Sequence, residues 1–275
     1  MTTITAVFAF ILGSAIGSFI SVVVHRLKKK KQSIVFSRSI CPACKKKLKF
    51  HHLFPVFSWL SLKGKCAFCG KKISPHYLAL EVATGLLFVA LFLNFNFIEA
   101  AVSTVIPTIV NYTINWETFA IFLFYVIESA LLMTIFFYDL KYKEIPDRLS
   151  IPAIAIAIAG GLVFETVAPL SMLIGGIALG GFFLIQFVLS KGKWVGGGDI
   201  RLGALMGIFL GWKFGLFALI AAYIIGSLIS IALLIQKKVS RKTAIPFGPF
   251  LVTGVYVAIF FGEIIINWYT NLLTF

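Results

Sequence analysis

Long uncharged apolar runs are the feature of this sequence that most constrains its fold. The first run, Ile4–Val24, contains no charged residue. The hydrocarbon core of a bilayer is about 30 Å thick, and a helix needs about 20 apolar residues to cross it. A secretory signal peptide would have a basic start, a shorter apolar core and a small-residue cleavage site, and none of these is evident. We therefore expect the first run to be a membrane helix that stays in the protein.

The rest of the chain continues this pattern. Hydrophobic residues make up 60% of the chain and charged residues 13%, which is about half the charged fraction of a soluble domain. We predict an all-α polytopic membrane protein, in which the sixth span is short enough to be re-entrant or packed inside the bundle. About eight transmembrane helices are expected, at residues 4–24, 78–98, 119–138, 149–167, 170–189, 202–212, 214–235 and 247–268.

Basic residues indicate how these spans are oriented. Every Lys and Arg except Lys213 falls in one of the segments 25–77, 139–148, 190–201 and 236–244. Cytoplasmic loops attract Lys and Arg, so we expect these segments in the cytoplasm and both termini outside. Contact with anionic lipid then explains the net charge of +15. No nucleic-acid-binding module is recognisable, so nucleic acid is not an expected partner.

The first cytoplasmic segment holds all four cysteines, as the pairs Cys41–Cys44 and Cys66–Cys69 with 21 residues between them. Two C-x2-C turns can complete a tetrahedral zinc site, and disulfides are unfavourable in the cytoplasm. Free cysteines or a redox pair are the alternatives. The nearby His51 and His52 are expected to be loop residues. The spacing predicts a structural Zn²⁺ with four sulfur ligands, Cys41, Cys44, Cys66 and Cys69.

Three of the ten carboxylates lie at the expected cytoplasmic ends of helices. Asp147, after Pro146, can cap the start of the next helix. Asp199 can also cap a helix, but the three glycines before it suggest a close backbone approach. Asp139 ends a helix, where the macrodipole disfavours an anion, and this favours a functional role. Two such aspartates can share a proton and activate water, or relay protons in a transporter.

Six blocks, in order along nearly the whole chain, resemble the type IV prepilin peptidase family. A GxGD motif alone would be weak, but six blocks in register are specific. The blocks are Gly17–Leu27, the two cysteine pairs, Glu81–Phe88, Asp139 with Ile145-Pro146-Asp147, Gly196–Leu202 with the GxGD motif, and Pro246–Leu251.

The resemblance implies an intramembrane aspartic endopeptidase of the bacterial cytoplasmic (inner) membrane. It would cut the basic leader from type IV prepilins or pseudopilins on the cytoplasmic side and then methylate the new N-terminus with S-adenosylmethionine. The catalytic pair falls on Asp139 and Asp199, and zinc on the four cysteines. From charge alone, we hypothesise that Asp147 or Glu144 meets the lysines of such a leader. The resemblance also implies that Gly196, Gly198, Pro146 and Asp147 form a supporting motif around the two catalytic aspartates.

The resemblance also implies a division of the chain and a set of partners. Residues 1–24 would form the first transmembrane helix, residues 25–77 a zinc domain associated with methyl transfer, and residues 78–275 a seven-span protease bundle. The implied partners would be prepilin substrates and the machinery of a type IV pilus or type II secretion system, in addition to the anionic lipid expected from the basic segments.

Two functions from other classes stay open. A proton-coupled membrane transporter would have carboxylates near the midplane and an inverted repeat, and no repeat is visible. A non-enzymatic membrane scaffold with a zinc docking domain would leave the three glycines and both aspartates unexplained. Cleavage of a prepilin by the purified protein separates these functions.

Overall fold

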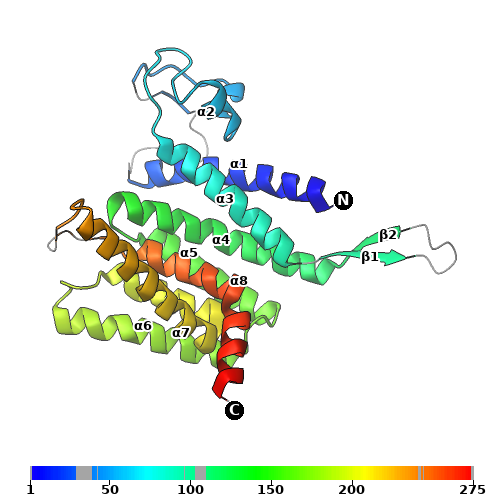
Figure 1. Ribbon diagram of the computed structural model, residues 1–275, viewed down its shortest axis with the longest axis vertical. Helices are drawn as coiled ribbons and strands as arrows, with labels where there is room; N and C mark the ends of the chain where they lie inside the picture. Colours follow the sequence, from blue (N-terminus) through cyan, green and yellow to red (C-terminus); the bar gives the residue numbers. More distant parts are fainter. Residues whose placement is uncertain are drawn as a thin grey trace. The chain divides into compact units, whose positions relative to one another are not determined.

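The computed structural model describes residues 2–28, 39–41, 43–95, 97–102, 110–240, 243 and 245–273, and most of these residues are helical (Figure 1). They form two compact units, Met1–Ala130 and Leu131–Phe275. Pro42, inside the first cysteine pair, lies outside the described residues.

The first unit is built on α1 (Thr2–Lys28) and α3 (Pro75–Asn94), which pack against each other. Gly13 lies at this interface, where a Cβ would come within 2.7 Å of the Cβ of Phe88, so a missing side chain lets the helices approach. The hydroxyl of Ser74 accepts from the N–H of His76 at 3.4 Å and caps α3. The chain between α1 and α3 contains the 3-10 helix η1 (Phe50–Leu53) and the short helix α2 (Phe57–Ser61).

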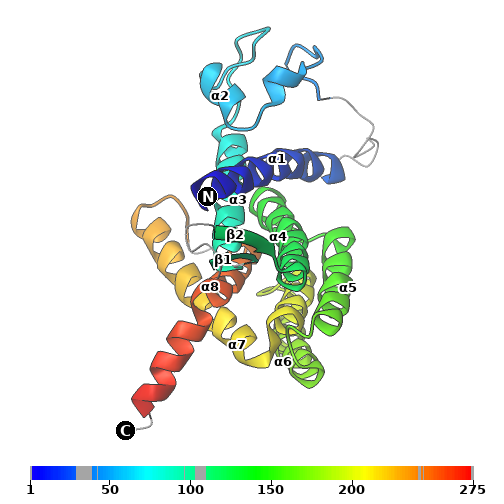
Figure 2. The same cartoon turned by 90° about the vertical axis from the view of Figure 1, so that its right-hand side faces the viewer.

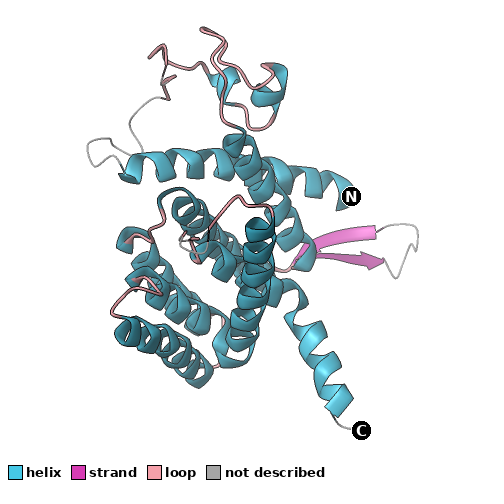
Figure 3. Cartoon of the chain, turned by 60° about the vertical axis from the view of Figure 1, so that its left-hand side comes forward, coloured by secondary structure: helices cyan, strands magenta, loops and turns pink. Residues whose placement is uncertain are grey.

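A β-hairpin follows α3 and was not predicted from the sequence. β1 (Ile98–Val102) pairs antiparallel with β2 (Val110–Ile114), with Ile98 opposite Ile114 (Figure 3, magenta). The second predicted span is therefore too long at its end, because Phe95 already leaves the helical conformation with φ −98° and ψ 92°. The predicted mostly helical membrane fold is otherwise confirmed.

The helix α4 (Trp116–Tyr142) continues from the first unit into the second. Its start is capped by Asn115, whose side-chain oxygen accepts from the N–H of Thr118 at 3.1 Å. Within the second unit, α7 (Gly197–Ile235) packs against α5 (Asp147–Val163), α6 (Pro169–Ser190) and α8 (Gly248–Leu273). The core there consists of apolar side chains at helical spacing, among them Leu202, Leu205, Met206, Ala218, Ala222, Leu251, Val252 and Val255.

The helix α7 consists of two arms joined at Gly211. Gly211 has φ 74° and ψ 172°, a conformation that residues with a side chain rarely adopt. Beyond it the chain folds back, since a Cβ at Gly215 would lie 3.3 Å from the Cα of Gly207, and Figure 2 shows the two arms meeting at an angle. Residues 197–210 rise only about 21 Å as a helix. This first arm is the short sixth span that the sequence predicts.

Six helices of the described chain, α1, α3, α4, α6, α7 and α8, are long and apolar enough to cross a membrane. The helix α5 has 17 residues, which is at the short end of the range for a span. Because α7 holds two of the predicted spans, the helices account for the expected number of about eight. The fourth span ends at Val163 rather than at residue 167, since Glu165 has φ 49°.

Candidate active site

Asp139 lies in the last turn of α4 and is only 5% exposed. Its Oδ2 accepts a hydrogen bond from the N–H of Gly248 at 3.0 Å. Gly248 is the first residue of α8, so the carboxylate lies at a helix N-terminus, where unpaired N–H groups and the macrodipole stabilise an anion. The start of α8 thus offsets the unfavourable end of α4. The sequence did not predict this partner, although Gly248 lies in one of the blocks that carry the resemblance.

Asp199 is the third residue of α7 and hydrogen-bonds the start of its own helix. Its Oδ2 accepts from the N–H of Gly196 at 3.0 Å, and Gly196 occupies the N-cap position. A carboxylate in the first turn is favoured by the same dipole argument. Asp199 therefore contributes to the cap of α7 from the third helical position, whereas the N-cap residue itself is Gly196 and not Asp199 as predicted.

Ile145 packs between the starts of α7 and α8. A Cβ on Gly198 would lie 2.6 Å from the Cβ of Ile145, and a Cβ on Gly248 would lie 3.2 Å from its Cδ1. Glycine at both positions therefore lets the two helix starts approach the loop that follows α4. This packing brings Asp139 and Asp199 to the same place, and the sequence did not predict a role for Ile145.

Arg201 ties the same loop to α7. Its Nη2 lies 2.5 Å from Oδ1 of Asp147 and donates to the carbonyl oxygen of Ile145 at 3.5 Å. The prediction that Asp147 caps α5 was wrong by one residue, because Pro146 occupies the N-cap position with φ −76° and ψ 139°. An ion pair this exposed stabilises the fold by only about 1 kcal/mol or less, so its effect is mainly to fix geometry.

Both aspartates line one cavity of about 440 Å³ in the second unit. They are close enough for their charges to interact. The volume lies in the range of sites that bind small ligands or peptide segments. Gly196 and Gly198 of the predicted supporting motif line it, while Pro146 and Asp147 do not. The lining residues are Asp139, Lys143, Glu144, Ile145, Trp194, Gly196, Gly197, Gly198, Asp199, Arg201, Ile245, Pro246 and Phe247.

The three glycines before Asp199 should differ in their tolerance of a side chain. A Cβ at Gly197 meets nothing within 4 Å, whereas a Cβ at Gly198 would clash with Ile145. We expect Gly198→Ala to cost about 1–3 kcal/mol through overpacking and Gly197→Ala to be neutral or slightly stabilising. Thermal unfolding of the two variants in detergent measures the difference. Equal midpoints for both would contradict the close packing of Gly198 on Ile145.

The four cysteines form a second site, in the first unit. Their sulfur atoms all lie within 4.8 Å of one another, and those of Cys41 and Cys69 are 3.9 Å apart. A tetrahedral zinc site with Zn–S bonds of about 2.3 Å has sulfurs about 3.8 Å apart, so the cluster fits a metal ion. Among the described residues, neither His51 nor His52 belongs to the cluster.

The two cysteine pairs have the same local fold. An isolated antiparallel β-bridge pairs Ile40 with Lys47, and another pairs Lys65 with Lys72. In both cases the residue before the first cysteine pairs with the third residue after the second cysteine. In both turns the fourth residue after the first cysteine has a positive φ, 55° at Lys45 and 67° at Gly70. The sequence spacing therefore produces two matching turns that direct their thiols to one point.

Electrostatics in the cluster also favour a cation. Backbone N–H groups of Cys44 and Ala43 lower the pKa of the Cys41 thiol to about 6. At Cys69 the N–H of Lys71 lowers the pKa, but partial desolvation and the three neighbouring thiols outweigh it and raise the pKa to about 11. The opposite shifts at Cys41 and Cys69 reflect four thiols held close together without a cation, and a bound metal ion would stabilise the thiolate forms.

A buried glutamate attaches the four-cysteine segment, residues 25–77, to the helices of the first unit. Glu81 of α3 accepts from the N–H of Val56 at 2.7 Å, and Val56 has the strained combination of φ 63° and ψ −55°. The sequence places Glu81 in a block of the resemblance without giving it a contact. The structure shows that it holds the turn before α2 against α3.

Comparison with known proteins identifies the family. The Bacterial Peptidase A24 N-terminal domain matches residues 11–95, and the Type IV leader peptidase family matches residues 126–231. A Bacillus subtilis protein named prepilin leader peptidase/N-methyltransferase is 30% identical over 263 residues, covering 96% of this chain and 97% of the relative. The chain belongs to the type IV leader peptidase family. The resemblance seen in the motifs is confirmed, as is the prediction of an enzyme of this kind.

Other members of the family are similar over nearly the whole chain. An Aeromonas salmonicida protein of the same name is 28% identical over 295 residues, with 95% of this chain and 92% of the relative covered. One from Legionella pneumophila is 29% identical over 281 residues, with 93% and 91% covered. No solved structure matches the chain.

Proposed function

We propose that this chain removes the leader of type IV prepilins or pseudopilins with Asp139 and Asp199, and then methylates the new N-terminus. The observation that carries the proposal is that one cavity is lined by both Asp139 and Asp199, which lie 60 residues apart in the sequence. Both belong to the part of the chain that matches the peptidase family, and both are held by backbone N–H groups at helix starts.

In the proposed reaction the two carboxyl groups share one proton. The ionised carboxylate takes a proton from water, and the hydroxide attacks the carbonyl carbon of the scissile peptide. The protonated carboxyl transfers its proton to the carbonyl oxygen. When the tetrahedral intermediate collapses, that oxygen returns its proton, the C–N bond breaks, and the leaving amine takes the proton that came from water. The pair then returns to its shared-proton state.

Substrate orientation follows from charge in this proposal. Glu144 lines the cavity, and we propose it as a contact for the basic leader. Asp147, favoured equally by the sequence, does not line the cavity. The site would open to the cytoplasm, on the same side as the basic four-cysteine segment, with the apolar part of the substrate lying in the bilayer. Anionic lipid would attract that basic segment, and the pilus or secretion machinery would supply the substrate.

We further propose that the four cysteines bind Zn²⁺ as a structural ion, because a site closed by four sulfur atoms has no open position for catalysis. S-adenosylmethionine is the proposed methyl donor, which supplies an electrophilic methyl group for the new N-terminal amine. We assign no residue of this chain to the donor, because the sequence has no glycine-rich nucleotide-binding turn after a strand.

Purified protein in detergent, mixed with a prepilin, tests the proposal. We expect mass spectrometry to show loss of the leader, and, with S-adenosylmethionine present, a gain of one methyl group on the mature product. A proton-coupled transporter would instead move protons across proteoliposomes and leave the prepilin intact, and a scaffold would do neither. Failure to cleave both in detergent and in reconstituted membranes would contradict the proposal.

A further inference from the structure

The four-cysteine segment exposes several large apolar side chains on η1 and α2, two elements that contact each other. Phe50 is 83% exposed, Phe57 61% and Leu60 54%. The rings of Phe54 and Phe57 lie 6.0 Å apart, and Leu60 follows Phe57 by three residues on the same face of α2. An exposed patch of this kind marks contact with a partner or a membrane. We call Phe50, Leu53, Phe54, Phe57 and Leu60 the apolar surface.

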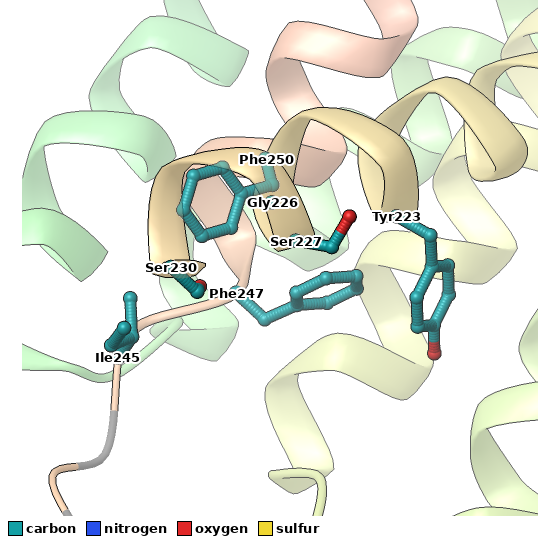
Figure 4. Close-up of a pocket in the computed structure, with 7 residues that line it drawn as sticks. All are labelled: Tyr223, Gly226, Ser227, Ser230, Ile245, Phe247 and Phe250. Atoms are coloured by element: carbon teal, nitrogen blue, oxygen red, sulfur yellow. The ribbon is translucent and has the colours of Figure 1, made fainter. Parts of the chain in front are cut away.

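Exposed aromatic side chains in the second unit have a packing role. The rings of Tyr223 and Phe247 lie 4.9 Å apart and line a cavity of about 220 Å³ between the second arm of α7 and the start of α8 (Figure 4). Tyr223 therefore packs within the fold, although it is 39% exposed. Phe50 and Phe57 line neither this cavity nor the aspartate cavity, so neither cavity explains their exposure.

A hydrogen bond places the apolar surface beside two membrane helices. The N–H of Val56, the N-cap residue of α2, donates to Oε2 of Glu81 at 2.7 Å. Glu81 is the seventh residue of α3, so it lies about 9 Å along that helix from its first residue. A Cβ on Gly17 would lie 3.0 Å from the Cα of Glu81, and Gly17 belongs to the uncharged run of α1. The helix α2 therefore begins at the level of the apolar parts of α1 and α3.

The charge of the segment favours a membrane over a protein as the partner of this surface. Residues 25–77 contain 14 Lys and Arg residues and no Asp or Glu, and every lysine of the segment that the structure describes is exposed. Anionic headgroups attract such segments. Interfacial elements bury their apolar side chains about 5–10 Å deep at the boundary between headgroups and acyl chains, which matches the level of Glu81. The basic leader of a prepilin would be repelled by the same charge.

We propose that the apolar surface lies in the headgroup region of a bilayer that contains anionic lipid. Phe54, Phe57 and Leu60 reach the acyl boundary, and the lysines contact lipid phosphates. The four-cysteine segment thus lies in the membrane interface instead of projecting into solvent. Insertion of apolar side chains goes beyond the attraction of a basic segment to lipid, and it does not depend on the assignment of Asp139 and Asp199.

Photocrosslinking of the full-length protein in lipid nanodiscs identifies what the apolar surface contacts. With p-benzoylphenylalanine in place of Phe57 and phosphatidylglycerol in the nanodisc, we expect mass spectrometry to find a lipid adduct as the main product. Replacing the anionic lipid by phosphatidylcholine, or combining Lys45→Gln, Lys46→Gln and Lys47→Gln, should lower the yield at least about three-fold. The control is the same probe in place of Phe19, which is 52% exposed on α1 and should label both lipids equally.

Hydrogen exchange of the unmodified protein covers the case in which the probe prevents folding. Amides of residues 50–61 should exchange at least about two-fold more slowly in anionic than in zwitterionic nanodiscs, while those of α3 should not change. Equal exchange in the two nanodiscs would overturn the proposal. So would a Phe57 probe that labels a second copy or an added prepilin, or that labels no lipid where the Phe19 probe does. Failure of leader removal would instead reject the proposed function and leave this contact intact.

Discussion

Replacing Cys44 by serine is expected to abolish metal binding and to unfold the four-cysteine segment while the membrane helices remain folded. The segment has little else to order it, since η1 contains no buried residue and neither does α2. A structural zinc ion supplies about 10–16 kcal/mol of apparent binding free energy in small zinc domains. Losing one of the four ligands is expected to remove most of this binding free energy and to leave three thiols without a cation.

The chain makes this test clean, because all four of its cysteines lie in the cluster. Elemental analysis should find one zinc per wild-type chain and none in Cys44→Ser. A thiol reagent should label the wild type only after chelation, and the variant without it. Ala43→Ser introduces the same residue next to the ligand and should keep the metal. Full zinc content in Cys44→Ser, or fully reactive thiols in the wild type as purified, would contradict a closed four-sulfur site.

The same variant separates the two proposed activities. The aspartates lie in the second compact unit and the cysteines in the first. We therefore expect Cys44→Ser to reduce methyl transfer more strongly than leader removal, measured on the same prepilin. An equal loss of both activities would show that the four-cysteine segment also supports cleavage.

The features that the sequence could predict depend on local patterns. Uncharged runs predict membrane helices because a helix that crosses the bilayer core needs about 20 predominantly apolar residues. The pairs Cys41–Cys44 and Cys66–Cys69 predict a cluster because both thiols of a pair are brought together by one turn. An acid at a helix end and three adjacent glycines make Asp139 and Asp199 stand out in the sequence, but it is the resemblance to the family that implies their catalytic role.

The features that the sequence could not predict depend on tertiary contacts. The hydrogen bond from Gly248 to Asp139 joins residues 109 positions apart, and no periodicity reveals such a pair. Ile145 looks like any other apolar loop residue until the starts of α7 and α8 pack on it. Aspartate is a residue type that often caps helices, but Asp147 instead forms an ion pair with Arg201, which lies 54 positions away in the sequence.

The second large effect is expected at the aspartates. Asp139→Asn and Asp199→Asn each remove a group that can exchange the proton, while the amide oxygen can still accept from Gly248 or Gly196. We expect each variant to fold and to lose leader removal by about 10²- to 10⁴-fold or more. Because residues that act as a unit are not additive, the double variant should be about as inactive as either single variant.

The variants need a control for the loss of an acid from the membrane bundle. Glu263 on α8 is exposed and lies outside the cavity, so Glu263→Gln should cleave at the wild-type rate. Thermal unfolding in detergent should give similar midpoints for all of these proteins. A large drop in the midpoint of Asp139→Asn alone would indicate that its bond to Gly248 serves folding rather than catalysis.

The most direct measurement is the initial rate of leader removal, followed by product mass, for the wild type, Asp139→Asn, Asp199→Asn and Glu263→Gln at equal folded concentrations. We predict rapid cleavage by the wild type and by Glu263→Gln, and no detectable product from either asparagine variant on the same timescale. Cleavage at the wild-type rate by Asp139→Asn or by Asp199→Asn would contradict the assignment of these two residues as the catalytic pair.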